Sequence, residues 1–258
     1  MQTIPLDAVR LRHGTHGSTF AGTGCIVEVA NRIAAGEVAD PGSLPPTTPV
    51  AFSDDHPSIS PVVRAFAIGL NDSWGDEERQ RLRPFARHLL FTASGPVEDE
   101  VRAWLAADWL VRTLCPAFLE LAGLAEHAGA LQDLEPLVSL RSAVGAQPAM
   151  FHARRAGAVA VSYAAREGAT AAPGALRVAA RSAGTEAAAV AAGLGRGPGA
   201  GPAAAARSTA WDVAGAAWRA DPSEVRATVE RLQASALELL GAMLHPGAIR
   251  RQEPPQQP

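Results

Sequence analysis

The chain has 258 residues, a net charge of −3 and a pI near 6.2, so it lacks the basic surplus expected of a protein that binds nucleic acid or an anionic membrane. Its 23 basic residues are all Arg. The absence of Lys excludes a Schiff-base lysine, a covalently held pyridoxal phosphate and the nucleotide-binding phosphate loop that ends in Lys.

Two cysteines, Cys25 and Cys115, are too few for a disulfide framework, and their separation does not fit a zinc ribbon. The first residues lack the pattern of a secretion signal, and no apolar run is long enough to span a bilayer. We therefore expect a cytoplasmic protein.

The N-terminal quarter holds short patterned segments between turns. Residues 9–12 favour a short strand, and residues 25–35 favour a helix with Thr23 as its N-cap and Gly36 after its end. Residues 38–57 contain four prolines before His56 and predict an extended loop. Loops of this length are uncommon and tend to be functional or disordered.

Helical patterns fill the next stretch. Ser60 and Pro61 begin a helix that reaches about residue 70. Asp76 is expected to cap a third helix, which Pro84 bends or divides. A core helix follows Pro96 and is expected to end at Pro116, and two shorter helices follow at 116–123 and 125–134.

The composition changes near residue 145, where long runs of Ala begin. Pro222 starts a C-terminal helix whose apolar residues recur at alternating spacings of four and three, as in a coiled coil: Val225, Val229, Leu232, Ala236, Leu239 and Met243. This seam predicts a possible homodimer through residues 222–244. We expect an N-terminal helical domain at 1–145, an Ala-rich helical region at 146–248 that packs on it, and a disordered tail at 249–258.

These patterns together predict an all-α protein. The expected architecture is an irregular bundle of about seven helices, with a possible short N-terminal strand and an Ala-rich C-terminal half. Trp74, Trp104, Trp109, Trp211 and Trp218 are expected to carry much of the packing, because Ala buries little surface.

Cys25 is the main candidate for a catalytic residue. It follows a Gly-Thr-Gly sequence at the start of a helix, where free amides and the helix dipole favour a thiolate. A nearby loop contains Asp54, Asp55 and His56, in which a carboxylate could orient the imidazole as a base for the thiol. The alternative is a small buried cysteine and a solvated histidine.

Other residues predict binding rather than catalysis. His13 and His16 lie in a Gly-rich segment and, with Cys25 or His56, could bind Zn²⁺. Glu28 lies one turn after Cys25 and could orient either site. Asp108, beside Trp109 in an otherwise apolar helix, could point into a pocket or pair with Arg112 four residues later. The Arg79, Arg81, Arg83 and Arg87 series is expected to be a solvated face.

Four segments resemble an uncharacterised family of Ala-rich helical proteins from actinobacteria and their phages: GCIVEVANRIAAGE, FSDDHPSISPVV, AWLAADWLVRTLCPAFLELAGLAEHAGAL and LQASALELLGAML. The likeness covers more than half of the chain in the same order. Its shared motifs fall on His16, on Gly24-Cys25 and on Ser53 to Pro57. This chain has one extra Asp in the last motif and Ile59 where such proteins often have Cys. The resemblance supports the choice of residues and implies no activity.

Three functions remain open from the sequence. The first is a helical binding or interaction protein whose partner is a small molecule, a protein or a peptide. The second is a cysteine-dependent hydrolase or transferase that uses Cys25, His56, Asp55 and Asp54. The third is a metal-binding protein with His and Cys ligands.

Overall fold

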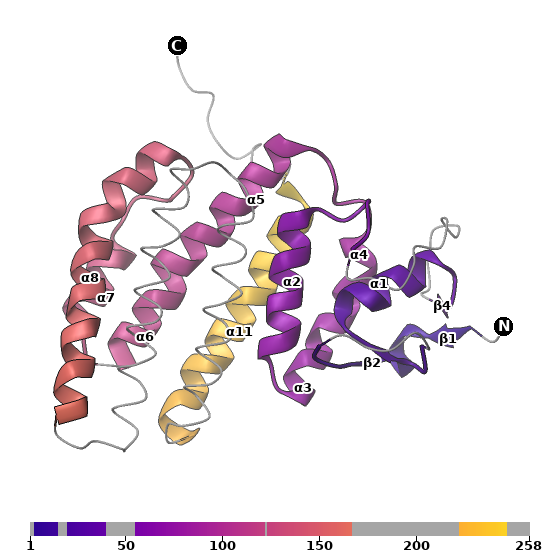
Figure 1. Ribbon diagram of the computed structural model, residues 1–258, viewed down its shortest axis with the longest axis horizontal. Coiled ribbons are helices and arrows are strands. Elements are labelled where there is room, and N and C mark those ends of the chain that lie inside the picture. The colour runs from indigo at the N-terminus through magenta and orange to yellow at the C-terminus, as the bar shows by residue number, and fades with distance from the viewer. Residues whose placement is uncertain (1–2, 15–19, 40–54, 122, 167–221, 247–258) are drawn as a thin grey trace, which may run out of the picture. The chain divides into compact units, whose positions relative to one another are not determined.

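A computed structural model describes residues 3–14, 20–39, 55–121, 123–166 and 222–246 (Figure 1). Helices account for most of them, so the prediction of an all-α irregular bundle is confirmed. The chain divides into two compact units, one formed by Met1–Asp99 with Leu240–Pro258 and the other by Glu100–Leu239.

The first unit contains two short pairs of parallel strands. Strand β1 (Ile4–Pro5) pairs with β4 (Val38–Ala39), and β2 (Arg10–Leu11) pairs with β3 (Thr23–Gly24). A 3-10 turn, η1 (Leu6–Ala8), joins β1 to β2. The strand expected at residues 9–12 is present as β2. The other strands were not predicted because two residues are too few to show an alternating pattern.

Helix α1 (Ile26–Ala34) follows β3 and connects it to β4. Its N-cap is Cys25, whereas the sequence indicated Thr23, which lies in β3. Because Thr23 pairs with Arg10 in the strands, it cannot cap the helix, and the N-cap lies two residues later. Gly36 has a φ of 73°, which only Gly adopts readily, and this confirms it as the residue that ends the helix.

Helix α2 (Pro61–Ser73) has the expected cap, because the Ser60 hydroxyl accepts the amide hydrogen of Val63. The following helical stretch is divided into α3 (Asp76–Arg79), a 3-10 segment η2 (Gln80–Phe85) and α4 (Ala86–Leu89). Pro84 lies in η2, so the predicted division is present. Gly75 rather than Asp76 is the N-cap of α3.

Helix α5 (Pro96–Trp109) begins in the first unit and continues into the second. It leads through a π-helical segment, η3 (Leu110–Leu114), into α6 (Cys115–Leu121). The prediction that Pro116 ends this helix is wrong. Pro116 lies in the first turn of α6, directly after the π-helical segment η3, and the helix continues through it.

Helices α7 (Ala125–Gln132), α8 (Leu140–Arg166) and α11 (Pro222–Leu244) follow, and α7 contacts both α6 and α8 (Figure 1). The change in composition near residue 145 falls inside α8, which continues through it without interruption. Ala-rich sequence changes side-chain size without ending a helix, so composition did not mark the boundary between the compact units.

The seam of α11 is covered within the chain. Leu232, Ala236, Leu239 and Met243 are all buried, while the side chain of Val225 lies outside the described residues. Val229 is partly exposed, and the homodimer through residues 222–244 stays a prediction.

The tryptophans that the structure describes, Trp74, Trp104 and Trp109, are buried, as expected. Trp211 and Trp218 lie outside the described residues. None of the described helices is both long and apolar enough to cross a lipid bilayer.

Candidate functional site

Cys25 forms the N-terminal cap of α1. Its Sγ accepts the amide hydrogen of Glu28 at 3.4 Å, and the Glu28 carboxylate accepts the amide hydrogen of Cys25 at 2.7 Å. These two reciprocal bonds make a capping box, with sulfur in the position that a Ser or Thr oxygen usually holds. Cys25 is only 2% exposed and Glu28 is 5% exposed, so both candidate residues contribute to the helix start from inside the unit.

Gly24 makes this capping possible. A Cβ placed on Gly24 would lie 3.1 Å from the Glu28 carboxylate and 3.3 Å from its Cβ, which is closer than side chains normally approach. A Gly beside a nucleophile can let a substrate approach closely, because it has no side chain. In the structure that space is occupied by the folded-back side chain of Glu28.

His56 is also buried, at 5% exposure, in the loop before α2. Its Nδ1 accepts the backbone amide hydrogen of Ser58 at 3.1 Å and lies 2.7 Å from the Ser58 hydroxyl. In the neutral ring the proton is then on Nε2, for which no described group serves as a hydrogen-bond partner. Burial lowers the pKa of His56, and the nearby Asp55 carboxylate opposes this effect only in part.

This tautomer is the opposite of the one that a base for Cys25 needs. A general base presents a lone pair toward the proton it removes, whereas His56 uses its lone pair on Ser58. Asp55 accepts a hydrogen bond from Arg64. The described contacts thus hold Cys25 and His56 through separate local partners, Glu28 and Ser58, and the Cys25–His56 pairing stays a prediction.

The remaining predicted residues are less constrained. His16 and Asp54 lie outside the described residues, and His13 is exposed. Within the described ranges, no three His, Cys, Asp or Glu side chains come close enough together to hold a metal ion.

Buried polar side chains that the sequence did not single out hold the first unit together. Asn71, fully buried, accepts the amide hydrogen of Ile26 at the start of α1 and donates to the Arg12 carbonyl. Arg79 is 3% exposed and donates to the carbonyls of Asn71 and Trp74. The prediction that Arg79 belongs to a solvated face is wrong, because three free carbonyl and carboxylate groups at the end of α2 and the start of α3 draw its guanidinium inward.

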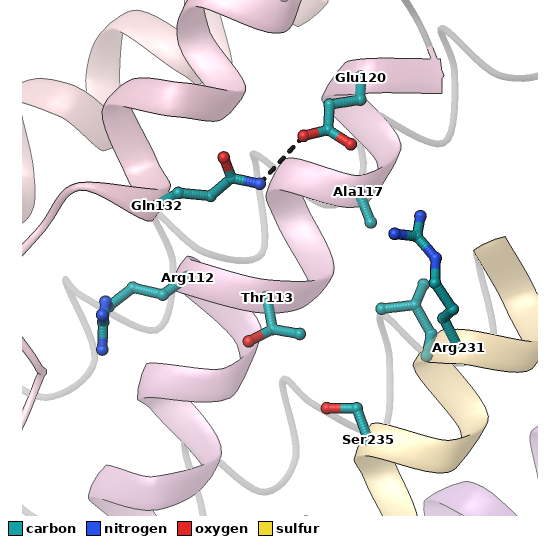
Figure 2. Close-up of a pocket in the computed structure, with 8 residues that line it drawn as sticks. Arg112, Thr113, Ala117, Glu120, Gln132, Arg231 and Ser235 are labelled. Atoms are coloured by element: carbon teal, nitrogen blue, oxygen red, sulfur yellow. Dashed lines mark hydrogen bonds between the residues drawn. The ribbon is translucent and has the colours of Figure 1, made fainter.

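A pocket of about 240 Å³ lies in the second unit, between η3, α6, α7 and α11 (Figure 2). Its lining combines two arginines, two hydroxyl side chains, an acid–amide pair and two apolar side chains: Arg112, Arg231, Thr113, Ser235, Glu120, Gln132, Ala117 and Leu232. Figure 2 shows Arg231 reaching from α11 toward Ala117 on α6, while the guanidinium of Arg112 points away from it.

The π-helical segment contributes two of these residues. A π turn widens the helix by one residue and rotates the side chains that follow it, and such turns are frequent at functional sites. Arg112 and Thr113 both belong to η3 and both line the pocket. The Nε of Arg112 is buried without a hydrogen-bond partner in the described part of the chain.

Hydrogen-bond donors outnumber acceptors in this pocket. Arg231 bonds only the Thr228 hydroxyl among the described residues, at 3.3 Å. Ser235 accepts the indole hydrogen of Trp109 at 2.9 Å, which leaves its own hydroxyl hydrogen to donate. The one carboxylate, that of Glu120, already accepts a hydrogen bond from Gln132 at 3.0 Å (Figure 2).

The predicted binding residues Asp108 and Trp109 lie next to the pocket lining. Asp108 pairs with Arg112 at 3.2 Å, as the four-residue spacing indicated, and also accepts the amide hydrogen of Leu137. Trp109 orients Ser235. The residues that line the pocket itself were not predicted, because Arg112 and Arg231 are more than 100 residues apart and no local motif joins them.

Comparison of the chain with protein-family models, with curated proteins and with solved structures finds no match. The function proposed below therefore rests on the residues and geometry of this chain alone.

Proposed function

We propose that this protein is a helical binding protein whose pocket in the second unit holds a small metabolite that carries a carboxylate or phosphate group. The observation that carries the proposal is the surplus of donors in the pocket, supplied by Arg231, Thr113 and Ser235. Carboxylate and phosphate oxygens are the acceptors that Arg binds best.

The size of the pocket limits the ligand. Its volume of about 240 Å³ is below the range of roughly 300–1,000 Å³ typical of drug-sized ligands. Ala117 and Leu232 provide a small apolar surface beside the donors. A metabolite with one to three anionic groups and a short carbon chain fits this combination of size and polarity.

An enzyme built on Cys25 is not the function we favour. The described contacts use the thiol to cap α1 and use the imidazole lone pair of His56 on Ser58. A binding function needs neither side chain to leave these positions.

Thermal unfolding in the presence of inorganic phosphate, succinate and citrate tests the proposal. At a ligand concentration about 100 times Kd, binding stabilises the folded state by about 2.7 kcal/mol and raises Tm accordingly. We expect at least one of these anions to raise the Tm of the wild type and to leave that of Arg231→Gln unchanged.

The matched control is Arg226→Gln, which removes an exposed arginine from the same helix outside the pocket lining. This variant should keep the full response, and sodium chloride at equal ionic strength should give none. The proposal fails if no anion raises Tm, or if both variants respond as the wild type does.

A further inference from the structure

Helix α8 directs its larger apolar side chains outward. Among the residues of α8 whose burial the structure describes, those that are buried are mostly small: Ala143, Ala146, Met150, Ala153 and Gly157. The bulkier Leu140, Val144, Phe151 and Val159 are between 48% and 59% exposed. A surface helix normally buries its larger apolar residues and exposes polar ones, so the reversed arrangement marks the outer face as a contact surface.

Three of these exposed residues form one stripe. With 3.6 residues per turn, Leu140, Val144 and Phe151 fall within about 40° of one another around the helix, whereas Val159 lies about 60° beyond Val144 and outside the stripe. From Leu140 to Phe151 the stripe is about 17 Å long. The ring of His152 packs edge-on against Phe151, with centroids 5.9 Å apart.

Positive charge borders the stripe. Helix α8 contains no Asp or Glu. Among those of its residues whose burial the structure describes, the exposed ionisable side chains are all basic: Arg141, His152, Arg154 and Arg155. By the same helical spacing, Arg154 lies on one side of the stripe and Arg141 and Arg155 on the other. The outer face of α8 is thus an apolar ridge between cationic flanks.

We propose that the outer face of α8 docks an acidic amphipathic helix of a partner protein. The partner's apolar residues would cover the stripe, and its carboxylates on either side would pair with Arg154 and with Arg141 and Arg155. A partner helix with apolar residues at every third or fourth position has a narrow apolar face, and such a face can cover the stripe on α8.

The neighbouring helix favours a narrow partner over a broad anionic surface. Helix α7 contacts α8, and exposed acidic side chains lie on α7 and in the connection that follows it: Glu126, Asp133 and Glu135. A flat anionic lipid surface would be repelled by these groups, whereas a single helix can contact α8 alone. This inference does not depend on the pocket proposed above, because none of the pocket residues belongs to α8.

A labelled synthetic peptide of three heptads tests the proposal by fluorescence anisotropy. Its heptads carry Leu at two core positions and Glu at the flanking positions, and a second peptide replaces each Glu by Lys. We expect the acidic peptide to bind the full-length protein, the basic peptide to bind about tenfold more weakly or less, and added salt to weaken the acidic complex.

Matched valine variants locate the contact. Val144→Glu places a like charge in the centre of the stripe and should weaken binding of the acidic peptide at least about tenfold. Val97→Glu changes an equally exposed valine, 51% in both cases, outside α8 and should leave binding unchanged. Both sites are exposed, so circular dichroism should show both variants folded.

Several outcomes would overturn the proposal. One is equal binding of the two peptides, and another is an equal loss in the two variants. Binding to phosphatidylglycerol vesicles that Val144→Glu abolishes, without binding of the peptide, would assign the face to a lipid surface. A dimer in light scattering that Val144→Glu dissociates would assign it to a second copy of the chain.

Discussion

The side-chain amide of Gln80 bonds both backbone groups of Leu11, accepting its N–H at 2.9 Å and donating to its C=O at 3.0 Å. One glutamine in η2 thus completes the hydrogen bonding of strand β2, as a neighbouring strand would. The two residues are 69 positions apart, and this pair ties the N-terminal strands to the helical part of the first unit.

Replacing Gln80 by Ala should lower the free energy of unfolding by about 1–3 kcal/mol, because the partly buried N–H and C=O of Leu11 both lose their partner. Urea unfolding followed by circular dichroism measures the change. Gln147→Ala, at an exposed position of α8, should change stability by less than about 0.5 kcal/mol. Equal effects at the two positions would contradict the role given to Gln80.

Cys25 should react slowly with iodoacetamide in the folded protein and rapidly once the chain is unfolded. Its thiol is 2% exposed and accepts a capping hydrogen bond. Cys115 is fully buried and serves as an internal reference. Mass spectrometry of the labelled peptides separates the two sites. Rapid labelling of Cys25 alone below pH 7 would instead favour the cysteine enzyme, because it would reveal a reachable thiolate.

The cap itself can be tested at the same position. Cys25→Ser retains an acceptor for the Glu28 amide, whereas Cys25→Ala removes it. We expect Cys25→Ala to be less stable than Cys25→Ser by about 1 kcal/mol in urea unfolding. The reverse order would show that burial of the sulfur matters more than capping.

His56 should make the protein less stable in mild acid. Burial lowers its pKa below the ordinary value of 6.5, so the unfolded chain binds the proton more readily than the folded protein does. The contribution of neutral His56 is complete above about pH 6.5 and is lost as the pH falls toward the lowered pKa. The slope should reach at most about 1.4 kcal/mol per pH unit.

Comparison of variants isolates this effect from other titrating groups. His56→Asn keeps an acceptor near the position of Nδ1 without a titrating ring, so its stability should fall less between pH 7 and pH 5.5 than that of the wild type. His152→Asn removes an exposed histidine and should follow the wild-type profile. Parallel profiles for all three proteins would contradict the prediction.

Phe91 has a φ of 64° and is 55% exposed, so it occupies the left-handed region while burying little surface. That conformation costs a side chain with a Cβ about 1–2 kcal/mol, and Asn adopts it more readily. We expect Phe91→Asn to raise the urea midpoint, with a gain of about 0.5–1 kcal/mol. Phe151→Asn, at an exposed helical position, should bring no gain.

Much of the local structure was predictable from the sequence. Ser60 and Pro61 marked the start of α2, Gly36 the end of α1, and Pro84 the division of the stretch after Gly75. The i,i+4 pair of Asp108 and Arg112 was also predicted. Each of these features depends on residues no more than about four positions apart, so the local sequence contains all the information that it needs.

The candidate site depended on tertiary contacts. The sequence singled out Cys25 and His56, but it could not show that Glu28 and Ser58 form hydrogen bonds with them or that both are buried. The pocket joins η3 to α11 across more than 100 residues, and the outward face of α8 is defined by what α8 buries. Periodicity identifies which residues share a helix face, whereas only packing against other helices decides which face becomes core and which remains exposed to solvent.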